Sequence, residues 1–432
     1  MQYSIPKGVF DILPQEPDSD NRWRESNRWQ YIEQMIRQLC STYGYKEIRT
    51  PIFEKTELFV RGVGEGSDIV SKEMYTFLDK ADRSMTLRPE GTASVMRAFV
   101  EKKLYTQQTL HKYFYIGPMF RYERPQGGRF RQFHQFGIEA IGIDAPEQDV
   151  EIIDLICNLY TSLGIKNLSV MINSVGGAES RLQFTEALKK FLEPKLDELS
   201  EDSKNRFQKN ILRILDSKDP KDQILLEKAP SILDFLTPDD KAHFQRVCHL
   251  LTELEISYTI NARLVRGLDY YTKTVFEITS TDLGSQNSIG GGGRYDGMTE
   301  TIGGPFLPSV GFASGLERVL QTMNQQAIVF PKTPHPMIYF IPMGSQAKTF
   351  CFTTASQLRH DNIPCEIDLS GKKIQSCLQM ANHLDAEFCV VIGDDELKTQ
   401  RAQIKNLNTR ESFEVALTEL PSKIIEMRKR NV

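Results

Sequence analysis

The stretch FRYERPQGGRFRQF, residues 120–133, lies between two segments that are rich in aromatic residues. Residues 110–123 and 131–141 each follow a strand-like pattern, and the loop 124–130, with its Gly-Gly tip, joins them as a hairpin. We therefore expect an antiparallel sheet at the centre of the fold. Arg121 is predicted to lie inside the first, buried strand, where its guanidinium group would need an anion as partner.

Arginines are concentrated in this hairpin, with four of them in the eleven residues 121–131. Planar guanidinium groups suit phosphate, and the glycines would let a phosphate or an RNA end approach the backbone. Alternation places Arg121 and Glu123 on one face of their strand. One face of the next strand carries Phe133, Gln135, Gly137 and Glu139. A pocket between them could hold a triphosphate, an aromatic ring and an ammonium group, although a solvated hairpin is the simpler alternative.

Three other stretches carry dense polar or glycine-rich patterns: TLRPEGT at 86–92, RGLDYY at 266–271 with GGGGRYDG at 290–297, and GFASGLER at 311–318. Four successive glycines predict a close approach to a ligand or a tight turn rather than a plain strand. Glu90 and Thr92 are either ligand-binding groups or ordinary residues at a helix N-terminus. Arg318, one turn into a helix that opens near Ser314, is either a ligand-binding group or a surface residue.

The flanking sequence indicates an α+β chain with several parts. Apolar residues at helical spacing predict a helix from Asn21 to Tyr43, and a strand over 46–49 should lie at an edge because Pro51 follows it. That edge would suit a subunit boundary. We expect a core in two pieces, 1–177 and 256–326, separated by a helical insertion, 178–255. A proline-rich linker, 327–336, then leads to an α/β domain, 337–432.

Composition excludes several classes of protein. The 432 residues carry a formal net charge of −4, so nucleic acid would have to bind through local patches rather than bulk positive charge. No apolar run approaches the roughly 20 residues of a membrane span, and the N-terminus lacks the apolar region of a signal peptide. The seven cysteines are scattered without metal-binding spacing. We expect reduced thiols, mostly in cores, in a cytoplasmic protein.

Together these motifs resemble a known family. The FRxE loop with the following RxxxF, the GLER turn and the first helix with its proline-ended strand resemble the three motifs of class II aminoacyl-tRNA synthetases. RGLDYYTKTVFE and GGGGRYDG resemble the two signatures of histidyl-tRNA synthetases. The resemblance covers nearly the whole chain. It implies a class II antiparallel sheet core with helices, a helical insertion, and a C-terminal α/β anticodon-binding domain.

The resemblance also implies an activity, which is condensation of histidine with ATP and transfer of the histidyl group to the 3′ end of tRNA(His). Arg121 and Arg266 would be the catalytic residues, both at the α-phosphate. ATP would be bound by Arg121, Glu123 at the adenine edge, Phe133 at the adenine face, and Arg129 and Arg318 at the distal phosphates. Mg²⁺ is implied as cofactor, without protein ligands assigned to it.

For histidine, the resemblance implies a second set of residues. Its ammonium group would be received by Glu90, Thr92 and Gln135, and its carboxylate by Arg121, with Arg266 nearby. Its imidazole would contact Glu139, Tyr271 and Tyr270. Gln126 matches a position that meets the tRNA acceptor end.

The expected partners are tRNA(His), histidine, ATP and a second copy of the chain in a homodimer, with neither DNA nor a membrane. Two alternative functions share part of this pattern. One is the regulatory paralogue of this family that binds histidine and controls ATP phosphoribosyltransferase, but such paralogues generally lack the C-terminal domain and an intact RGLDYY segment. The other is a class II ligase for a different amino acid, which the Tyr270-Tyr271 pair and GGGGRYDG disfavour.

Overall fold

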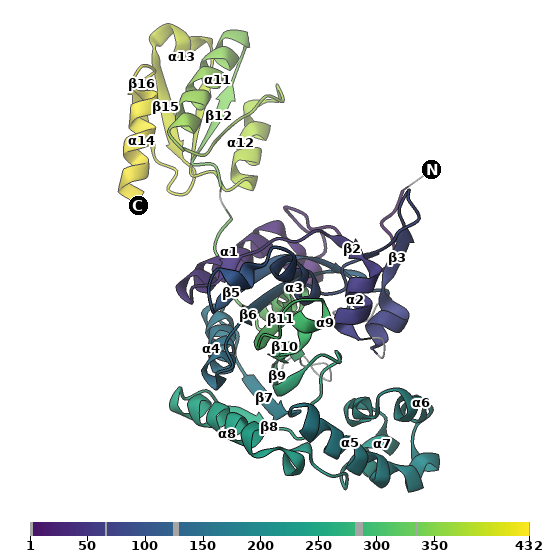
Figure 1. The fold of residues 1–432 in the computed structure, drawn as a ribbon. Coiled ribbons are helices and arrows are strands. Elements are labelled where there is room, and N and C mark those ends of the chain that lie inside the picture. The colour runs from purple at the N-terminus through teal and green to yellow at the C-terminus, as the bar shows by residue number, and fades with distance from the viewer. Residues whose placement is uncertain (1–2, 65–66, 124–128, 281–287, 334, 432) are drawn as a thin grey trace. The chain divides into compact units, whose positions relative to one another are not determined.

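An eight-stranded sheet lies at the centre of residues 1–330 in the computed structural model (Figure 1). The strands from β5 to β7 pair antiparallel, and β1 and β8, at the two edges, run parallel to their neighbours. In spatial order the strands are β1 (Lys46–Glu47), β5 (His111–Phe120), β6 (Gln132–Ile141), β11 (Ser309–Gly315), β10 (Ser288–Arg294), β9 (Thr272–Ser280), β7 (Leu168–Ser174) and β8 (Tyr258–Ile260). The predicted antiparallel core is confirmed.

The structure describes every residue except 1–2, 65–66, 124–128, 281–287, 334 and 432. The chain divides into two compact units, Met1–Phe330 and Pro331–Val432, and the division falls inside the proline-rich stretch 327–336. Within the described residues no helix has the length and apolar character needed to cross a membrane.

One face of the sheet is covered by four helices that share its largest core: α1 (Ser26–Thr42), α4 (Pro146–Ser162), α8 (Pro238–Glu253) and α10 (Leu316–Gln325). In α1 the buried residues Trp29, Ile32, Ile36 and Cys40 recur every three or four positions, which is the amphipathic pattern that predicted the helix. The helix is shorter than predicted, because Ser19–Arg24 forms a separate 3-10 helix and Glu25 is extended. Likewise α10 begins at Leu316 rather than near Ser314.

The opposite face carries α2 (Thr56–Val63), α3 (Thr92–Glu101) and α9 (Met298–Thr301), whose apolar residues join a second core. A small sheet in the order β2 (Phe53–Lys55), β4 (Ser84–Leu87), β3 (Tyr75–Leu78) lies beside α2 and α3. Two short helical turns complete this side, the π-helix η2 (Ile69–Glu73) and the 3-10 helix η3 (Leu104–Thr106). The chain passes from β4 directly into α3 through the TLRPEGT stretch, residues 86–92.

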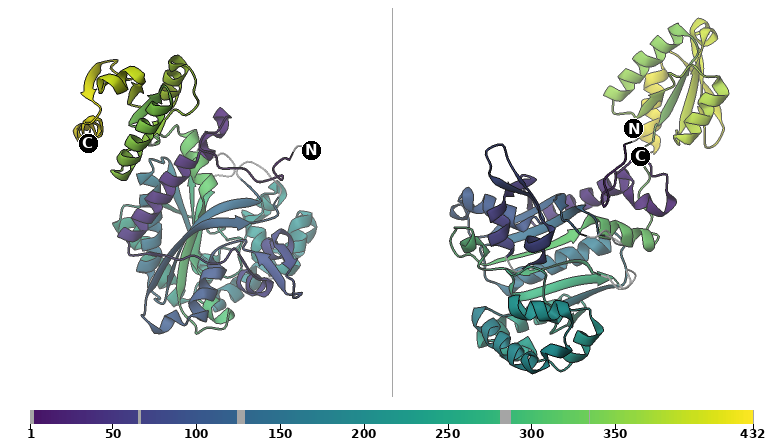
Figure 2. Two further views of the ribbon diagram at one scale, coloured as in Figure 1. Left: turned by 90° about the horizontal axis from the view of Figure 1, so that it is seen from above. Right: turned by 90° about the vertical axis from the view of Figure 1, so that its right-hand side faces the viewer.

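Between β7 and β8 all the regular elements are helices, and they gather near the β7–β8 edge of the sheet, where they are teal in Figures 1 and 2. Asp222 is fully buried there and accepts hydrogen bonds from the hydroxyl groups of Ser200, Ser203 and Ser217, which ties three segments together. Before α8, these segments are α5 (Ala178–Leu192), η4 (Glu193–Glu198), α6 (Glu201–Lys209), η5 (Ile211–Asp216), α7 (Pro220–Leu226) and η6 (Ile232–Phe235).

The C-terminal unit is an α/β fold with a five-stranded sheet in the order β13-β12-β14-β15-β16. Helices α11 and α14 share one core with the sheet, and α12 belongs to a separate core built on Tyr339, Ile341 and Cys389. The elements are β12 (Ile338–Pro342), α11 (Ser345–His360), β13 (Cys365–Ile367), α12 (Ile374–His383), β14 (Phe388–Ile392), α13 (Asp394–Thr399), β15 (Arg401–Asn406), β16 (Ser412–Ala416) and α14 (Leu420–Asn431).

Two expectations about the site segments are wrong. The tetraglycine is neither a turn nor irregular, because Gly290–Gly293 lies within β10 between β9 and β11. A Cβ at Gly292 would lie 2.1 Å from the Gly311 carbonyl oxygen, so glycine is required for the strands to come this close. Arg121 is not inside a buried strand. β5 ends at Phe120. The Arg121 amide still donates to the Arg131 carbonyl, next to β6, and the Tyr122 amide then donates to the Glu73 carbonyl of another segment.

Candidate active site

A cavity of about 890 Å³ opens on the sheet face that carries α2, α3 and the first helices of the insertion. The cavity brings together segments that are far apart in the sequence: the end of β5, the start of α3, the RGLDYY stretch, and the strands β6, β10 and β11. The predicted site residues that line it are Glu90, Thr92, Arg121, Glu123, Arg129, Gln135, Arg266, Tyr270 and Tyr271.

Three of the predicted residues that the structure describes are not among those that line the cavity. Glu139 is 1% exposed and lies behind Thr92 and Tyr295. Phe133 packs under Arg121, whose guanidinium carbon is 5.3 Å from the ring centroid. Arg318 lies near Arg129. Burial, and then the charge of this neighbour, lower the pKa of Arg318. Gln126 falls outside the described residues.

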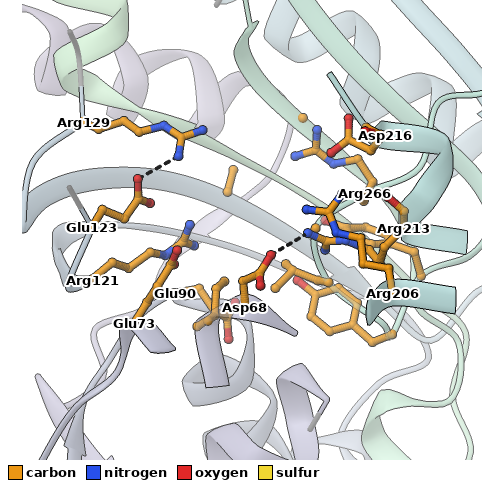
Figure 3. Close-up of a pocket in the computed structure, with 18 of the residues that line it drawn as sticks. Asp68, Glu73, Glu90, Arg121, Glu123, Arg129, Arg206, Arg213, Asp216 and Arg266 are labelled. Atoms are coloured by element: carbon orange, nitrogen blue, oxygen red, sulfur yellow. Dashed lines mark hydrogen bonds and ion pairs between the residues drawn. The ribbon is translucent and has the colours of Figure 1, made fainter. Parts of the chain in front are cut away.

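Arg121 is positioned by backbone and ring contacts rather than by a strand. Its Nε donates to the Pro89 carbonyl oxygen at 2.8 Å, while the side chain remains half-buried at the cavity wall. The contact joins the β5 end to the segment just before Glu90. Figure 3 shows Arg121 and Arg129 on one side of the cavity and Arg266, Arg213 and Arg206 on the other. An anion in the middle would therefore have guanidinium groups on both sides.

Glu123 and Arg129 form an ion pair at 2.9 Å across the hairpin (Figure 3). The resemblance implies separate partners for these two side chains, adenine and phosphate. Glu73, from η2, lies near them, and its burial and then the Glu123 charge raise the pKa of Glu73. This end of the cavity thus holds two carboxylates and two arginines within one small volume.

Arg266 lies against the glycine strand. Its Nη1 is 3.4 Å from Glu277 Oε1, and a Cβ at Gly291 would lie 2.6 Å from its guanidinium carbon. Gly291 therefore provides the space in which the guanidinium group lies flat on the sheet. At Gly291 the close approach is made by the Arg266 side chain, and an approach by a ligand stays a prediction.

Glu90 stands at a helix N-terminus, which is one of the two interpretations of its sequence position; its binding of a ligand stays a prediction. Its two carboxylate oxygens accept the backbone N–H groups of Thr92 and Ala93, each at 2.8 Å, so it caps α3. It also lines the cavity. Burial raises the pKa of Glu90, and the hydrogen bonds from the helix N-terminus act against this change.

Three tyrosines form the deep end of the cavity. The ring centroids of Tyr270 and Tyr271 are 4.7 Å apart, and those of Tyr270 and Tyr295 are 5.5 Å apart. Gln135, on β6, lines the same cavity, and its buried Oε1 has no hydrogen-bond partner among the described residues. An empty acceptor in a buried position is well suited to receive a donor from a ligand.

Comparison with known proteins shows which family this geometry serves. The family model for histidyl-tRNA synthetase matches residues 19–319, and the model for the anticodon-binding domain matches residues 337–427. The chain belongs to the histidyl-tRNA synthetase family.

Individual relatives agree over the full length. The chain is 54% identical to a histidine–tRNA ligase of Protochlamydia amoebophila, over 97% of this chain and 99% of that protein. It is 47% identical to the histidine–tRNA ligase of Bacillus subtilis, over 97% of each protein. The crystal structure of the apo histidyl-tRNA synthetase of S. aureus superposes with a TM-score of 0.82, at 38% identity, over 98% of this chain and all of that one.

The chain is accordingly a histidine–tRNA ligase. It activates histidine with ATP and transfers the histidyl group to tRNA. Within the synthetase fold, the cavity lies where the class II motifs meet the two histidine signatures. The predicted fold class, with an anticodon-binding α/β unit at the C-terminus, is confirmed.

Sequence reasoning missed the part of the site that the helical insertion of the synthetase supplies. Arg206, Arg213 and Lys218 line the cavity from the insertion, and Arg213 pairs at 3.3 Å with Asp68, which precedes η2 (Figure 3). These charges occur in ordinary helical sequence, so no local signal marks them. Tyr295 was also missed, although it stands inside GGGGRYDG, because the glycines dominate that motif.

Metal ligands are sparse around the synthetase cavity. The described residues contain no group of three or more His, Cys, Asp or Glu side chains placed to hold a metal ion. The carboxylates of Glu73 and Glu123 are the kind of partial ligand set that Mg²⁺ uses when phosphates and water complete its coordination. The cavity wall thus offers carboxylate oxygens of the kind that a magnesium ion binds.

Proposed function

We propose that the cavity binds histidine and ATP side by side, with Arg121 and Arg266 holding the histidine carboxylate and the α-phosphate between them. The observation that carries this proposal is the placement of two arginines on opposite sides of one cavity (Figure 3). Each is anchored by the protein, Arg121 through the Pro89 carbonyl and Arg266 through Glu277 and the glycine strand.

The first step forms a bond between a histidine carboxylate oxygen and the α-phosphorus, and it breaks the bond from that phosphorus to the departing pyrophosphate. Two anions must approach each other, so positioning and fixed positive charge matter more than proton transfer. Arg121 and Arg266 would supply that charge without reorganising. In the second step a hydroxyl group at the tRNA 3′ end attacks the histidyl carbonyl, and AMP leaves.

For ATP, we propose Phe133 at the adenine face, Glu123 at the adenine edge, and Arg129 and Arg318 at the distal phosphates. The electrostatics favour this arrangement, because Arg129 and Arg318 are neighbouring cations and a polyanion would relieve their repulsion. Binding would replace the present ion pair between Glu123 and Arg129. Magnesium, bound with the phosphates near Glu73, would neutralise part of the charge on the leaving pyrophosphate.

For histidine, we propose that Glu90, Thr92 and Gln135 receive the ammonium group. The unpartnered Oε1 of Gln135 and the buried carboxylate of Glu90 are suitable acceptors. Glu139, with Tyr270 and Tyr271 at the deep end, would receive the imidazole. A side chain without ring N–H groups would leave these buried polar groups unpaired, which rejects other amino acids.

We propose that tRNA is held at two places, with its anticodon at the unit Pro331–Val432 and its acceptor end near the loop that contains Gln126. The separate compact C-terminal unit supports this division of labour. Because linked binding sites reinforce each other, losing one should weaken tRNA binding far more than it weakens the binding of small substrates.

A shortened protein that ends at Phe330 tests this proposal. It should keep most of the histidine-dependent exchange of pyrophosphate into ATP, while kcat/KM for tRNA should fall about a hundredfold or more. Both rates are measured on the same preparation beside the full chain. Equal losses in the two assays would contradict the assignment. Exchange that depends on another amino acid would contradict the proposed histidine pocket.

We also propose that two copies of the chain associate through the small sheet β2-β4-β3. Four large apolar side chains are exposed there: Ile52 at 45%, Phe53 at 50%, Phe77 at 43% and Leu78 at 64%. The rings of Phe53 and Phe77 pack edge to face across β4, with centroids 6.1 Å apart. A contiguous exposed apolar patch of this kind is typical of a protein–protein interface.

Replacing both rings by carboxylates, Phe53→Asp with Phe77→Asp, should convert a dimer into a monomer. Two buried charges at an interface would cost several kcal/mol, enough to dissociate it at micromolar concentration. Sedimentation equilibrium measures the mass. Leu182→Asp, an exposed apolar position on α5, is the control and should remain dimeric. A wild-type protein with the mass of one chain would contradict the proposal at once.

We place the enzyme in the cytoplasm, where tRNA is charged. The seven cysteines support a reducing compartment, because all of them are free thiols and Cys40, Cys351, Cys365, Cys377 and Cys389 are buried.

A further inference from the structure

Glu139 is held from two sides by hydroxyl groups of other segments. The Thr92 hydroxyl, at the start of α3, donates to Glu139 Oε1 at 2.7 Å, and the Tyr295 hydroxyl, just after β10, donates to Oε2. Thr92 and Tyr295 both line the cavity, whereas Glu139 is 1% exposed. Tyr295 itself is almost fully buried, so its hydroxyl cannot turn to bulk water.

The contact between Tyr295 and Glu139 depends on a glycine from a third segment. A Cβ at Gly311, on β11, would lie 2.0 Å from Glu139 Oε2 and 2.8 Å from the Tyr295 hydroxyl oxygen. Gly311 also lines the cavity. The missing side chain therefore leaves room both for the hydrogen bond and for a ligand atom to approach the carboxylate.

The arrangement makes Glu139 a hydrogen-bond acceptor of fixed orientation. Each carboxylate oxygen can accept two hydrogen bonds, so one donor on each oxygen leaves capacity for an imidazole N–H. Burial raises the pKa of Glu139 to about 8, and the hydrogen bonds from Tyr295 and Thr92 oppose that rise. The two hydroxyl groups thus act toward the ionised, accepting form, and burial acts more strongly against it.

We propose that Tyr295 is a positioning residue for histidine selection, because its hydroxyl group orients the Glu139 carboxylate that accepts the imidazole N–H. This inference rests on the role proposed for Glu139. It gives the tyrosine of GGGGRYDG and the first glycine of GFASGLER a shared purpose, since Gly311 leaves the room in which the Tyr295 hydroxyl reaches the carboxylate.

Steady-state pyrophosphate exchange by the full-length Tyr295→Phe protein tests the inference. Loss of a hydrogen bond to a charged group should raise KM for histidine about tenfold or more and leave KM for ATP within about twofold. Tyr160→Phe is the matched control. Tyr160 is equally buried and donates to Ser314 Oγ at 2.8 Å, but it does not line the cavity. Its KM values should match the wild type.

Thermal unfolding of both variants separates a local effect from a general loss of structure. Similar melting temperatures, together with a rise in KM for histidine in Tyr295→Phe alone, support the inference. It is overturned if KM for histidine is unchanged, or if KM for histidine and KM for ATP rise together. Glu139→Gln separates the proposed role of Glu139 from the positioning role of Tyr295. An unchanged KM for histidine in that variant would refute the role of Glu139 itself. A raised value beside an unaffected Tyr295→Phe would refute only the positioning role.

Discussion

Replacing Arg266 by alanine should reduce histidine-dependent pyrophosphate exchange by about a hundredfold or more, since removal of one preorganised charge at a reacting phosphate typically has this effect. The side chain lies flat against Gly291 and pairs with Glu277, so its position is fixed before substrates bind. The loss should appear chiefly in kcat, because the charge acts where negative charge accumulates in the transition state.

Arg263→Ala provides the comparison for this variant. Arg263 lies three residues earlier, is exposed, and bonds Gln223 in the insertion at 3.3 Å. Its removal should leave exchange within about twofold, as expected for a surface substitution. Circular dichroism of both variants should match the wild type. A loss of less than tenfold in Arg266→Ala would contradict a catalytic role for this guanidinium group.

The largest effect on stability is expected at Arg294. This guanidinium group is fully buried and bonds both oxygens of the buried Asp149, at 3.0 and 2.8 Å, and the Ala145 carbonyl at 2.7 Å. Arg294→Met would leave the buried Asp149 without this cation, while Asp296 would keep only Lys273, at 3.6 Å. Removing one partner of such a pair destabilises a protein by about 3–5 kcal/mol, which urea unfolding followed by circular dichroism would detect.

An exposed arginine provides the control for Arg294. Arg37 is 40% exposed and pairs with Glu33 and Glu47, so Arg37→Met should change the free energy of unfolding by no more than about 1 kcal/mol. Adding Asp149→Asn to Arg294→Met should restore part of the loss, because it removes a buried charge. Equal destabilisation by the two arginine variants would show that burial of the ion pair is unimportant.

The hairpin and the helices of the core could be predicted because their signals are local. The aromatic alternation of β5 and β6 and the helical spacing in α1 depend only on neighbouring residues. Arg121 was predicted inside the strand because the strand-like pattern of the sequence continues to residue 123, whereas β5 ends at Phe120. Pairing with Glu73, from a different segment, takes the backbone away from β6. The glycine strand was missed because its backbone spacing depends on neighbouring strands, not on its own propensity.

The residues of the candidate site that belong to short sequence motifs could be predicted. Nine predicted residues meet in one cavity because each motif stands at the end of a strand or the start of a helix that the sheet brings together. Arg213 and Asp68 could not be predicted, because their contact depends on where the insertion packs against the core. Nor could Arg294, which resembles a surface residue in a glycine-rich turn until Asp149, in α4, is seen beside it.

The glycine strand limits how far this part of the sequence can drift. At Gly292 the nearest obstacle to a side chain is the backbone of β11, which cannot move without separating the sheet. At Gly291 the obstacle is the end of the Arg266 side chain, which can swing away. The two neighbouring glycines therefore differ in what a side chain would cost. At Gly292 it would disturb the pairing of the strands, whereas at Gly291 it would spare the fold and displace the guanidinium group that we propose at the α-phosphate.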